Sequence, residues 1–158
     1  MVRTNTIQPR VDLEGETVRG AYRAMCHFDG ATARLELDPL LRELIRVRAS
    51  MLNGCAYCVD MHTKDARARG ETEQRLYAVA AWHEAPFFSP AERAALALTD
   101  ALTMLAGNPL PDAVVAEAED QLGAEGLAAA TWIILTINAW NRFAIASHSE
   151  AGHYEPGE

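Results

Sequence analysis

The chain has 158 residues, of which 49% are apolar, and this length and composition are typical of one folded globular domain over residues 1–158. The formal net charge is −8 and no basic stripe is present, which argues against binding to nucleic-acid phosphates or to an anionic membrane surface. We therefore expect neither a nucleic-acid nor a membrane partner.

Start and stop signals divide the chain into helices with short connections. Asp38-Pro39 combines an N-cap acceptor with proline at the first helical position, and residues 89–92, SPAE, form a capping box. Asn53-Gly54 and Gly123 are helix stops, because glycine adopts the left-handed conformation without a Cβ penalty. The expected helices cover residues 14–28, 39–52, 55–69, 72–82, 89–105, 111–122 and 125–147.

No segment is a convincing strand, so the predicted fold class is all-α, with six or seven helices. Residues 1–13 show no periodicity and are expected to form an N-terminal arm, and residues 148–158 are expected to form a loose tail. The last helix is apolar nearly all round, which favours burial in a core or in a subunit contact.

Several features bear on localisation. Residues 1–6 lack the apolar run of a secretory signal. The most apolar stretch, residues 127–146, is interrupted by Asn138, Asn141 and Arg142, so a buried helix is a better interpretation than a membrane span. The three cysteines are an odd number and do not suit a secreted disulfide framework. We therefore expect a cytoplasmic protein.

Residues 53–62, NGCAYCVDMH, carry the pattern that points to chemistry. Cys55 falls at the start of a helix, so Cys55, Cys58 and His62 are spaced i, i+3 and i+7 and project from one face. The unpaired N–H groups of a first helical turn stabilise a thiolate. Two thiols that can form a disulfide, with an imidazole beside them, predict a redox site.

A pair of this kind can reduce a peroxide or a disulfide partner. Attack of a thiolate on an O–O bond leaves a sulfenic acid, and a second thiol one helical turn away condenses with it to form a disulfide. His62 is placed to exchange the protons of this reaction. The third cysteine, Cys26, is expected to pack as a small apolar residue on its own helix.

A structural zinc site is the main alternative, because zinc proteins also use Cys-x-x-Cys. A closed zinc site needs four ligands, and the sequence has no second Cys-x-x-Cys and no His-x-x-x-His. Glu43, His83 or Asp60 would have to complete the set. Buried side chains without chemistry are the remaining alternative. Taken on its own, Glu43 is most simply an exposed helix residue paired with a neighbouring arginine.

Residues 44–67, LIRVRASMLNGCAYCVDMHTKDAR, closely resemble the alkylhydroperoxidase AhpD-like core of the carboxymuconolactone decarboxylase superfamily, and the resemblance is specific over about residues 35–82. It implies an AhpD-like fold built around a helical hairpin that carries the Cys-x-x-Cys motif, and a homo-oligomer, from dimer or trimer to hexamer. The family's Glu, twelve residues before the first Cys, and its His, four after the second, correspond to Glu43 and His62.

The resemblance implies that Cys58 attacks the peroxide, that Cys55 resolves the sulfenic acid and that Glu43 and His62 form a proton relay. The helix-start argument instead favours Cys55 as the more acidic and more exposed thiol. Tyr57 stands where the best-known peroxidase members have a second histidine, and a tyrosine cannot serve as a base near neutral pH. The family also includes decarboxylases that do not depend on a cysteine pair, so the presence of both cysteines argues against that activity.

The expected function is a thiol-dependent peroxidase that reduces hydroperoxides through Cys55 and Cys58. No flavin, haem or nucleotide motif is visible, so we expect no cofactor and no metal, with electrons arriving by thiol–disulfide exchange. The resemblance implies a lipoyl group or another thiol protein as the donor. The alternatives are a thiol–disulfide oxidoreductase or redox sensor with little peroxide turnover, and a non-catalytic helical module with a structural metal.

Overall fold

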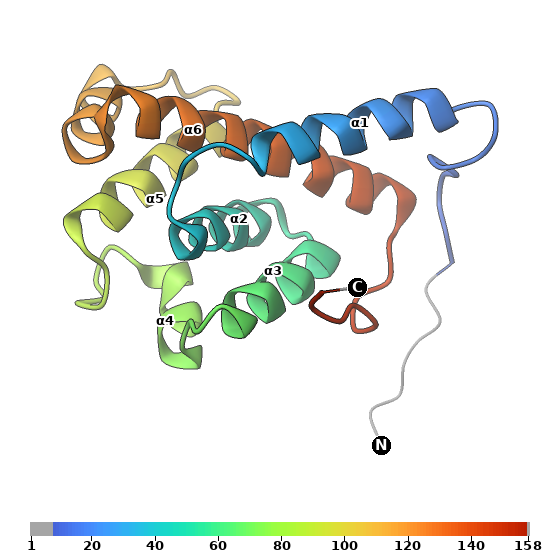
Figure 1. Ribbon diagram of the computed structural model, residues 1–158, viewed down its shortest axis with the longest axis horizontal. Helices are drawn as coiled ribbons and strands as arrows, with labels where there is room; N and C mark the ends of the chain where they lie inside the picture. The colour runs from blue at the N-terminus through green and yellow to red at the C-terminus, as the bar shows by residue number, and fades with distance from the viewer. Residues whose placement is uncertain (1–7, 158) are drawn as a thin grey trace.

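The computed structural model describes residues 8–157 and is helical throughout, with no strand among these residues (Figure 1). The all-α prediction is therefore confirmed. The structure comprises six α-helices and one short 3-10 helix: α1 (Arg19–Thr32), α2 (Pro39–Asn53), α3 (Ala56–Ala68), α4 (Glu73–Ala78), η1 (Val79–Ala81), α5 (Pro90–Thr103) and α6 (Asp112–Ser147). Gly123 is non-helical (φ 72°, ψ 168°) and breaks α6 where the sequence placed a helix stop.

Helix α2 is the centre of the fold, because it packs against α3, α5 and α6. In Figure 1 the long α6 crosses one side of the molecule with α1 alongside it, and the α2–α3 hairpin lies beneath them. Leu44, Ile45 and Val47 of α2 are fully buried, and each such side chain contributes about 1.5–3 kcal/mol of burial free energy. Ile45 packs in a cluster with α5 and α6, whereas Leu44 and Val47 pack in a second cluster that reaches α3 and α4.

The hairpin between α2 and α3 is set by caps that the sequence contains. The Asp38 side chain accepts a hydrogen bond from the Leu41 N–H at 2.8 Å, and Pro39 follows it at the first helical position. Gly54 ends α2 in the left-handed conformation, with φ 70° and ψ 30°. The chain can then reverse within two residues and begin α3 at Cys55, which is its N-cap.

Helix α1 differs from its predicted bounds at both ends. It begins at Arg19 rather than at residue 14, because the Asp12 carboxylate accepts hydrogen bonds from the backbone N–H groups of Glu14 and Gly15 and holds a turn there. It continues past Gly30 to Thr32, because Gly30 keeps a helical backbone.

The C-terminal tail, expected to be loose over residues 148–158, is not loose in its described part, residues 148–157, and residue 158 lies outside the described part of the chain. The Tyr154 hydroxyl donates to Asp65 Oδ1 at 2.7 Å, and Lys64 Nζ donates to the Tyr154 carbonyl at 2.8 Å. The Gly152 N–H donates to Asp60 Oδ2 at 3.0 Å. These partners all lie on α3, so the tail is fastened along that helix. Of the expected N-terminal arm, residues 1–7 lie outside the described part of the chain.

One described helix, α6, is long and apolar enough to cross a membrane by length and composition alone. The buried central helix of a globular protein passes the same test. The side chains of Ile133, Ile134 and Ile137 lie in the protein core, and Asn141 is buried with its amide hydrogen-bonded, so α6 serves here as a core helix.

Gly54→Ala tests the role of the left-handed cap. We expect a loss of about 1–2 kcal/mol in the free energy of unfolding, because a Cβ meets no neighbouring atom there and the cost is backbone strain alone. Gly20→Ala is the control, since Gly20 is helical and its Cβ would also meet open space. Urea unfolding should show Gly20→Ala neutral or slightly stabilised, and equal effects of the two changes would contradict the cap interpretation.

Candidate active site

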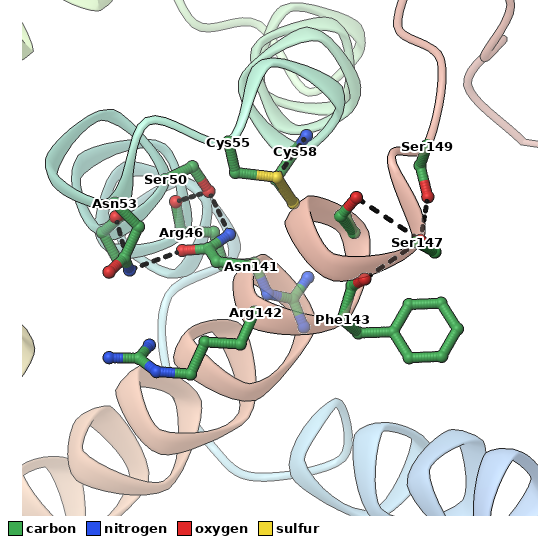
Figure 2. The surroundings of a disulfide bond; sticks show 12 residues. Arg46, Ser50, Asn53, Cys55, Cys58, Asn141, Arg142, Phe143, Ser147 and Ser149 are labelled. Carbon is green, nitrogen blue, oxygen red and sulfur yellow. Dashed lines mark hydrogen bonds between the residues drawn. A yellow bond between two sulfur atoms is a disulfide. The ribbon is translucent and has the colours of Figure 1, made fainter. Parts of the chain in front are cut away.

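Cys55 and Cys58 form a disulfide at the start of α3 (Figure 2). Cys55 is the N-cap residue, and its sulfur accepts a hydrogen bond from the Cys58 N–H at 3.3 Å. The side chains are 1% and 2% exposed, so the expectation that Cys55 is the more exposed thiol is not met in this oxidised state. The geometry places both sulfurs where the helix N-terminus stabilises negative charge after reduction.

Glu43 and His62 meet beneath the pair. Glu43 comes from α2 and His62 from α3, and His62 Nδ1 lies 3.0 Å from Glu43 Oε2. Glu43 is 1% exposed and His62 is 5% exposed, so the pair is shielded from bulk water. The simple interpretation of Glu43 as an exposed surface residue is therefore wrong. The packing of α2 on α3 brings together two residues that are 19 positions apart in the chain.

Glu43 is held as a carboxylate by surrounding positive charge. Its Oε1 lies 3.2 Å from Arg46 NH1 and 3.6 Å from Arg69 NH1. Burial by itself raises the pKa of the Glu43 carboxyl, but the hydrogen bond with His62 and the nearby cations outweigh burial and hold that pKa below its ordinary value of 4.5. An ionised Glu43 accepts a hydrogen bond from His62 Nδ1 and so orients the imidazole ring.

Two cavities open on this group of residues. The larger has a volume of about 390 Å³ and is lined by His62 together with Tyr22, Tyr57, Met61 and Trp140, among others. A smaller one of about 100 Å³ is lined by Cys58 and shares Tyr22, Tyr57, Met61 and Trp140 with the first. Cys58 and His62 thus face adjoining spaces that have the same aromatic walls.

Polar residues in α6 fix that helix against the hairpin. The Asn53 amide donates to Asn141 Oδ1 at 2.9 Å, and Asn141 donates to Ser50 Oγ at 3.0 Å (Figure 2). The Asn53 amide also donates to Asn138 Oδ1 at 3.0 Å. Asn141 and Ser50 are fully buried, and buried amides of this kind are costly to leave unpaired. The asparagines that interrupt the apolar stretch therefore position α6 beside the disulfide.

Cys26 corrects a prediction made from the sequence. It was expected to pack as an apolar residue, but its side chain is exposed and lines the larger cavity. Helix α1 packs mainly on α6, so only one side of it is covered. Tyr22, one turn earlier, packs against Trp140 and Phe143, and Cys26 is left at the edge of that contact.

The alternative zinc set is not assembled. Asp60 is engaged with Lys64 and the Gly152 N–H, and His83 stacks on the Trp82 ring at 3.7 Å between centroids. Among the described residues, Glu43, His62 and Asp65 place ligand atoms within 4.8 Å of one another. Glu43 is already paired with cations, however, and Cys55 and Cys58 are joined to each other, so neither of these two cysteines is a thiolate ligand in this oxidised state.

Sequence reasoning missed the residues that border the site from elsewhere in the chain. Tyr22, Trp140, Asp65 and Tyr154 line the larger cavity, and no local motif marks them. Burial and then the hydrogen bond to Asp65 raise the pKa of Tyr154 to about 12, so this phenol stays protonated as a donor. The spacing of Asp65, three residues after His62 on the same helix, was the one available signal.

Sequence comparison places the chain among known proteins. Residues 19–101 match the sequence model of the carboxymuconolactone decarboxylase family. The chain is 40% identical over 129 residues to the uncharacterized protein YdfG of Bacillus subtilis, which covers 82% of this chain and 88% of YdfG. It is 35% identical over 71 residues to the uncharacterized protein YnjA of Escherichia coli, over 45% of this chain and 39% of YnjA.

Solved structures show the same fold. A protein of unknown function from Agrobacterium tumefaciens, assigned by inference to antioxidant defence as AhpD, superposes with a TM-score of 0.87 at 31% identity, over 93% of this chain and all of that one. An uncharacterized peroxidase-related AhpD core protein from Ralstonia eutropha superposes with a TM-score of 0.77 at 23% identity, over 92% of this chain and 77% of that one. A cysteine-to-alanine variant of the debrominase Bmp8, in complex with 2,3,4-tribromopyrrole, superposes with a TM-score of 0.74 at 16% identity. The superposition covers 97% of this chain and 95% of that one. The predicted AhpD-like fold is confirmed.

Glu43→Gln tests the buried charge. The folded pKa of Glu43 lies below its unfolded value, so the charge stabilises the fold above about pH 4.5 and this contribution is lost as pH falls through the folded pKa. We expect the variant to lose about 1–3 kcal/mol of unfolding free energy at pH 7, and less at pH 4 and below.

The measurement is urea unfolding of both proteins across this pH range. Glu36→Gln, a change at an exposed carboxylate, is the control and should stay within about 0.5 kcal/mol of wild type. A Glu43→Gln deficit that is the same at every pH would contradict the ionised-pair interpretation.

Proposed function

This chain belongs to the carboxymuconolactone decarboxylase family, and on that basis we propose that it is a thiol-dependent peroxidase that reduces hydroperoxides through Cys55 and Cys58. The observation that carries the proposal is the disulfide-forming pair next to a buried Glu43–His62 pair, with aromatic cavities beside it. The cysteine pair also argues against a decarboxylase that works without thiols.

In the proposed reaction Cys58 attacks the hydroperoxide and Cys55 then resolves the oxidised Cys58. The Cys58 thiolate attacks the terminal oxygen of the hydroperoxide, the O–O bond breaks, and an alcohol leaves after taking up a proton. Cys58 becomes a sulfenic acid. The Cys55 thiolate attacks that sulfur, the S–O bond breaks, and hydroxide leaves and takes up a proton to become water. The product is the Cys55–Cys58 disulfide, the form seen in this structure. A dithiol then returns the pair to the reduced state.

The relay residues would move the protons. His62 Nδ1 is hydrogen-bonded to Glu43, which leaves Nε2 as the nitrogen that can take a proton from a thiol and return it to the leaving alkoxide. Positioned acid–base catalysis of this kind increases the reaction rate by about 10²–10⁴-fold. Tyr57 lines the cavities of both His62 and Cys58, where it can donate a hydrogen bond to the substrate without acting as a base.

Thiol–disulfide exchange with little peroxide turnover is the second candidate, and Tyr57 is the residue that favours it. The position between the cysteines carries no imidazole, so only His62 supplies proton transfer at the pair. In either case the electron donor would be a dithiol protein or a lipoyl-type group. Such a donor operates in a reducing compartment, which is consistent with a cytoplasmic protein.

A homo-oligomer is the proposed assembly. Trp132 and Leu135 of α6 are 48% and 44% exposed, and Ile145 further along is 37% exposed. Large apolar side chains on the outer side of a helix whose other side fills the core are typical of a subunit contact.

Alkylation and intact mass before and after one equivalent of an organic hydroperoxide test the proposed activity. We expect two thiols to be lost and mapped to Cys55 and Cys58, with Cys26 still free, because the resolving thiol is one helical turn away. Three free thiols after prolonged exposure would exclude peroxide as the substrate.

Single variants then assign the two roles. Cys58→Ser should abolish peroxide consumption, whereas Cys55→Ser should leave one turnover that ends in a trapped sulfenic acid. Equal single-turnover activity in Cys58→Ser would reverse the assignment.

Light scattering at micromolar concentration tests the assembly. We expect a multiple of the 17.3 kDa chain mass, and Leu135→Lys should shift the protein toward monomer, because a charge buried in an apolar contact is costly. Leu105→Lys places the same charge at an exposed position after α5 and is the control. A monomeric wild type would refute the proposal.

A further inference from the structure

A third cavity opens on the other side of the disulfide. Its volume is about 250 Å³, and its walls come from three places: residues 54–57 at the turn of the hairpin, Ala144 and Ile145 near the end of α6 with His148, Ser149 and Ala151 after it, and Arg10 of the N-terminal arm. Cys55 lines this cavity, whereas Cys58 and His62 line the other two. We call it the Cys55 groove.

The two cysteines of the disulfide therefore line different spaces. Tyr57 lines all three cavities, so it borders both the Cys55 groove and the aromatic cavities. A molecule in the Cys55 groove lies beside Cys55, and a molecule in the aromatic cavities lies beside Cys58 and His62. A reductant and a peroxide can then reach the pair by separate routes.

The charge of the Cys55 groove is opposite to that of the chain. The chain carries −8 overall, yet the described lining holds the Arg10 guanidinium and the His148 imidazole and no carboxylate. Arg10 is held in place, because its N–H donates to the Ser147 carbonyl at 3.1 Å and its NH1 to the Ile145 carbonyl at 3.4 Å. Arginine stays protonated at any working pH, so the cation is permanent.

The volume limits what can enter. Cavities that hold drug-sized ligands begin near about 300 Å³, so the Cys55 groove suits a small thiol or the end of a thiol-bearing arm, and not a folded domain. Its lining combines one cysteine of the disulfide, Cys55, with a cation, Arg10.

We propose that the Cys55 groove is the reductant subsite, and that Arg10 selects a small thiol that carries a carboxylate. The proposal rests on the proposed redox function of the pair and adds the route and the charge of the electron donor. Arg10 acts by binding and positioning the donor and takes no part in bond making.

Two successive thiol–disulfide exchange steps reduce the Cys55–Cys58 disulfide. A donor thiolate attacks the sulfur of Cys55, the Cys55–Cys58 bond breaks, and Cys58 leaves as a thiolate that takes up a proton. The second donor thiol loses its proton and attacks the donor sulfur of the mixed disulfide, which releases Cys55 as a thiolate. The donor is oxidised to a disulfide, the cysteines gain two electrons, and the two protons pass from the donor to the cysteine thiols.

Two dithiols that differ only in a distant charge test the selection: dihydrolipoate and its neutral amide. The rate of reduction of the Cys55–Cys58 disulfide is followed by alkylation and intact mass, and normalised to the reduction of a small neutral disulfide. In wild type at low salt we expect the acid to be about two- to fivefold faster than the amide, and salt should remove the difference.

Arg10→Gln should bring that ratio to about one, whereas Arg34→Gln, a change at an exposed arginine near another cavity, should preserve it. A wild-type ratio near one, or a ratio unchanged by Arg10→Gln, would overturn the proposal. Mapping the mixed disulfide in wild type is the second measurement, because it does not depend on the variants. A donor attached at Cys55 supports the groove, and a donor attached at Cys58 contradicts it.

Failure of this proposal is distinguishable from failure of the peroxidase proposal. If the acid is preferred through Arg10 but the reduced protein does not consume peroxide, the groove stands and the peroxidase function fails. If peroxide is consumed but acid and amide are equivalent, the peroxidase function stands and the groove fails.

Discussion

The buried hydrogen bond between Glu43 and His62 is the constraint that the rest of the site depends on. A carboxylate that is 1% exposed is stable only with partners, and here His62, Arg46 and Arg69 supply them. Because these partners come from both helices of the hairpin, the charge ties the register of α2 to that of α3. The same packing fixes the ring of His62 one turn beyond Cys58, so the imidazole and the cysteine pair lie along α3 and its N-cap.

Helix α6 supplies the other half of the architecture. Its apolar side fills the core, and its asparagines hydrogen-bond to Asn53 and Ser50 at the end of α2. Hydrogen bonds between buried amides are directional, so they set where α6 lies along the hairpin more sharply than apolar packing alone would. The disulfide is consequently enclosed by the last turns of α6, as Figure 2 shows, and its access is confined to defined cavities.

The fold is shared by proteins with different names. Structures that share it include peroxidase-related proteins and a debrominase, at identities that establish the fold alone for the more distant ones. In this chain the surroundings of the disulfide include a tyrosine between the cysteines, aromatic residues that line a cavity with Cys58, and Arg10, which lines a separate groove with Cys55.

The sequence by itself determined the features that depend on neighbours in the chain. The caps at Asp38, Gly54 and Ser89 fixed where helices begin and end, because a cap is a contact within a few residues. The Cys-x-x-Cys spacing determined that the two sulfurs can bond. Glu43 and His62 could be identified as candidate site residues from their spacing to the same motif. The tertiary structure alone decided that Cys26 is exposed, that the tail is fastened along α3 and that Arg10 and Cys55 line one groove. Those contacts join segments tens of residues apart or more, and they form only when packing of the helices brings the segments together.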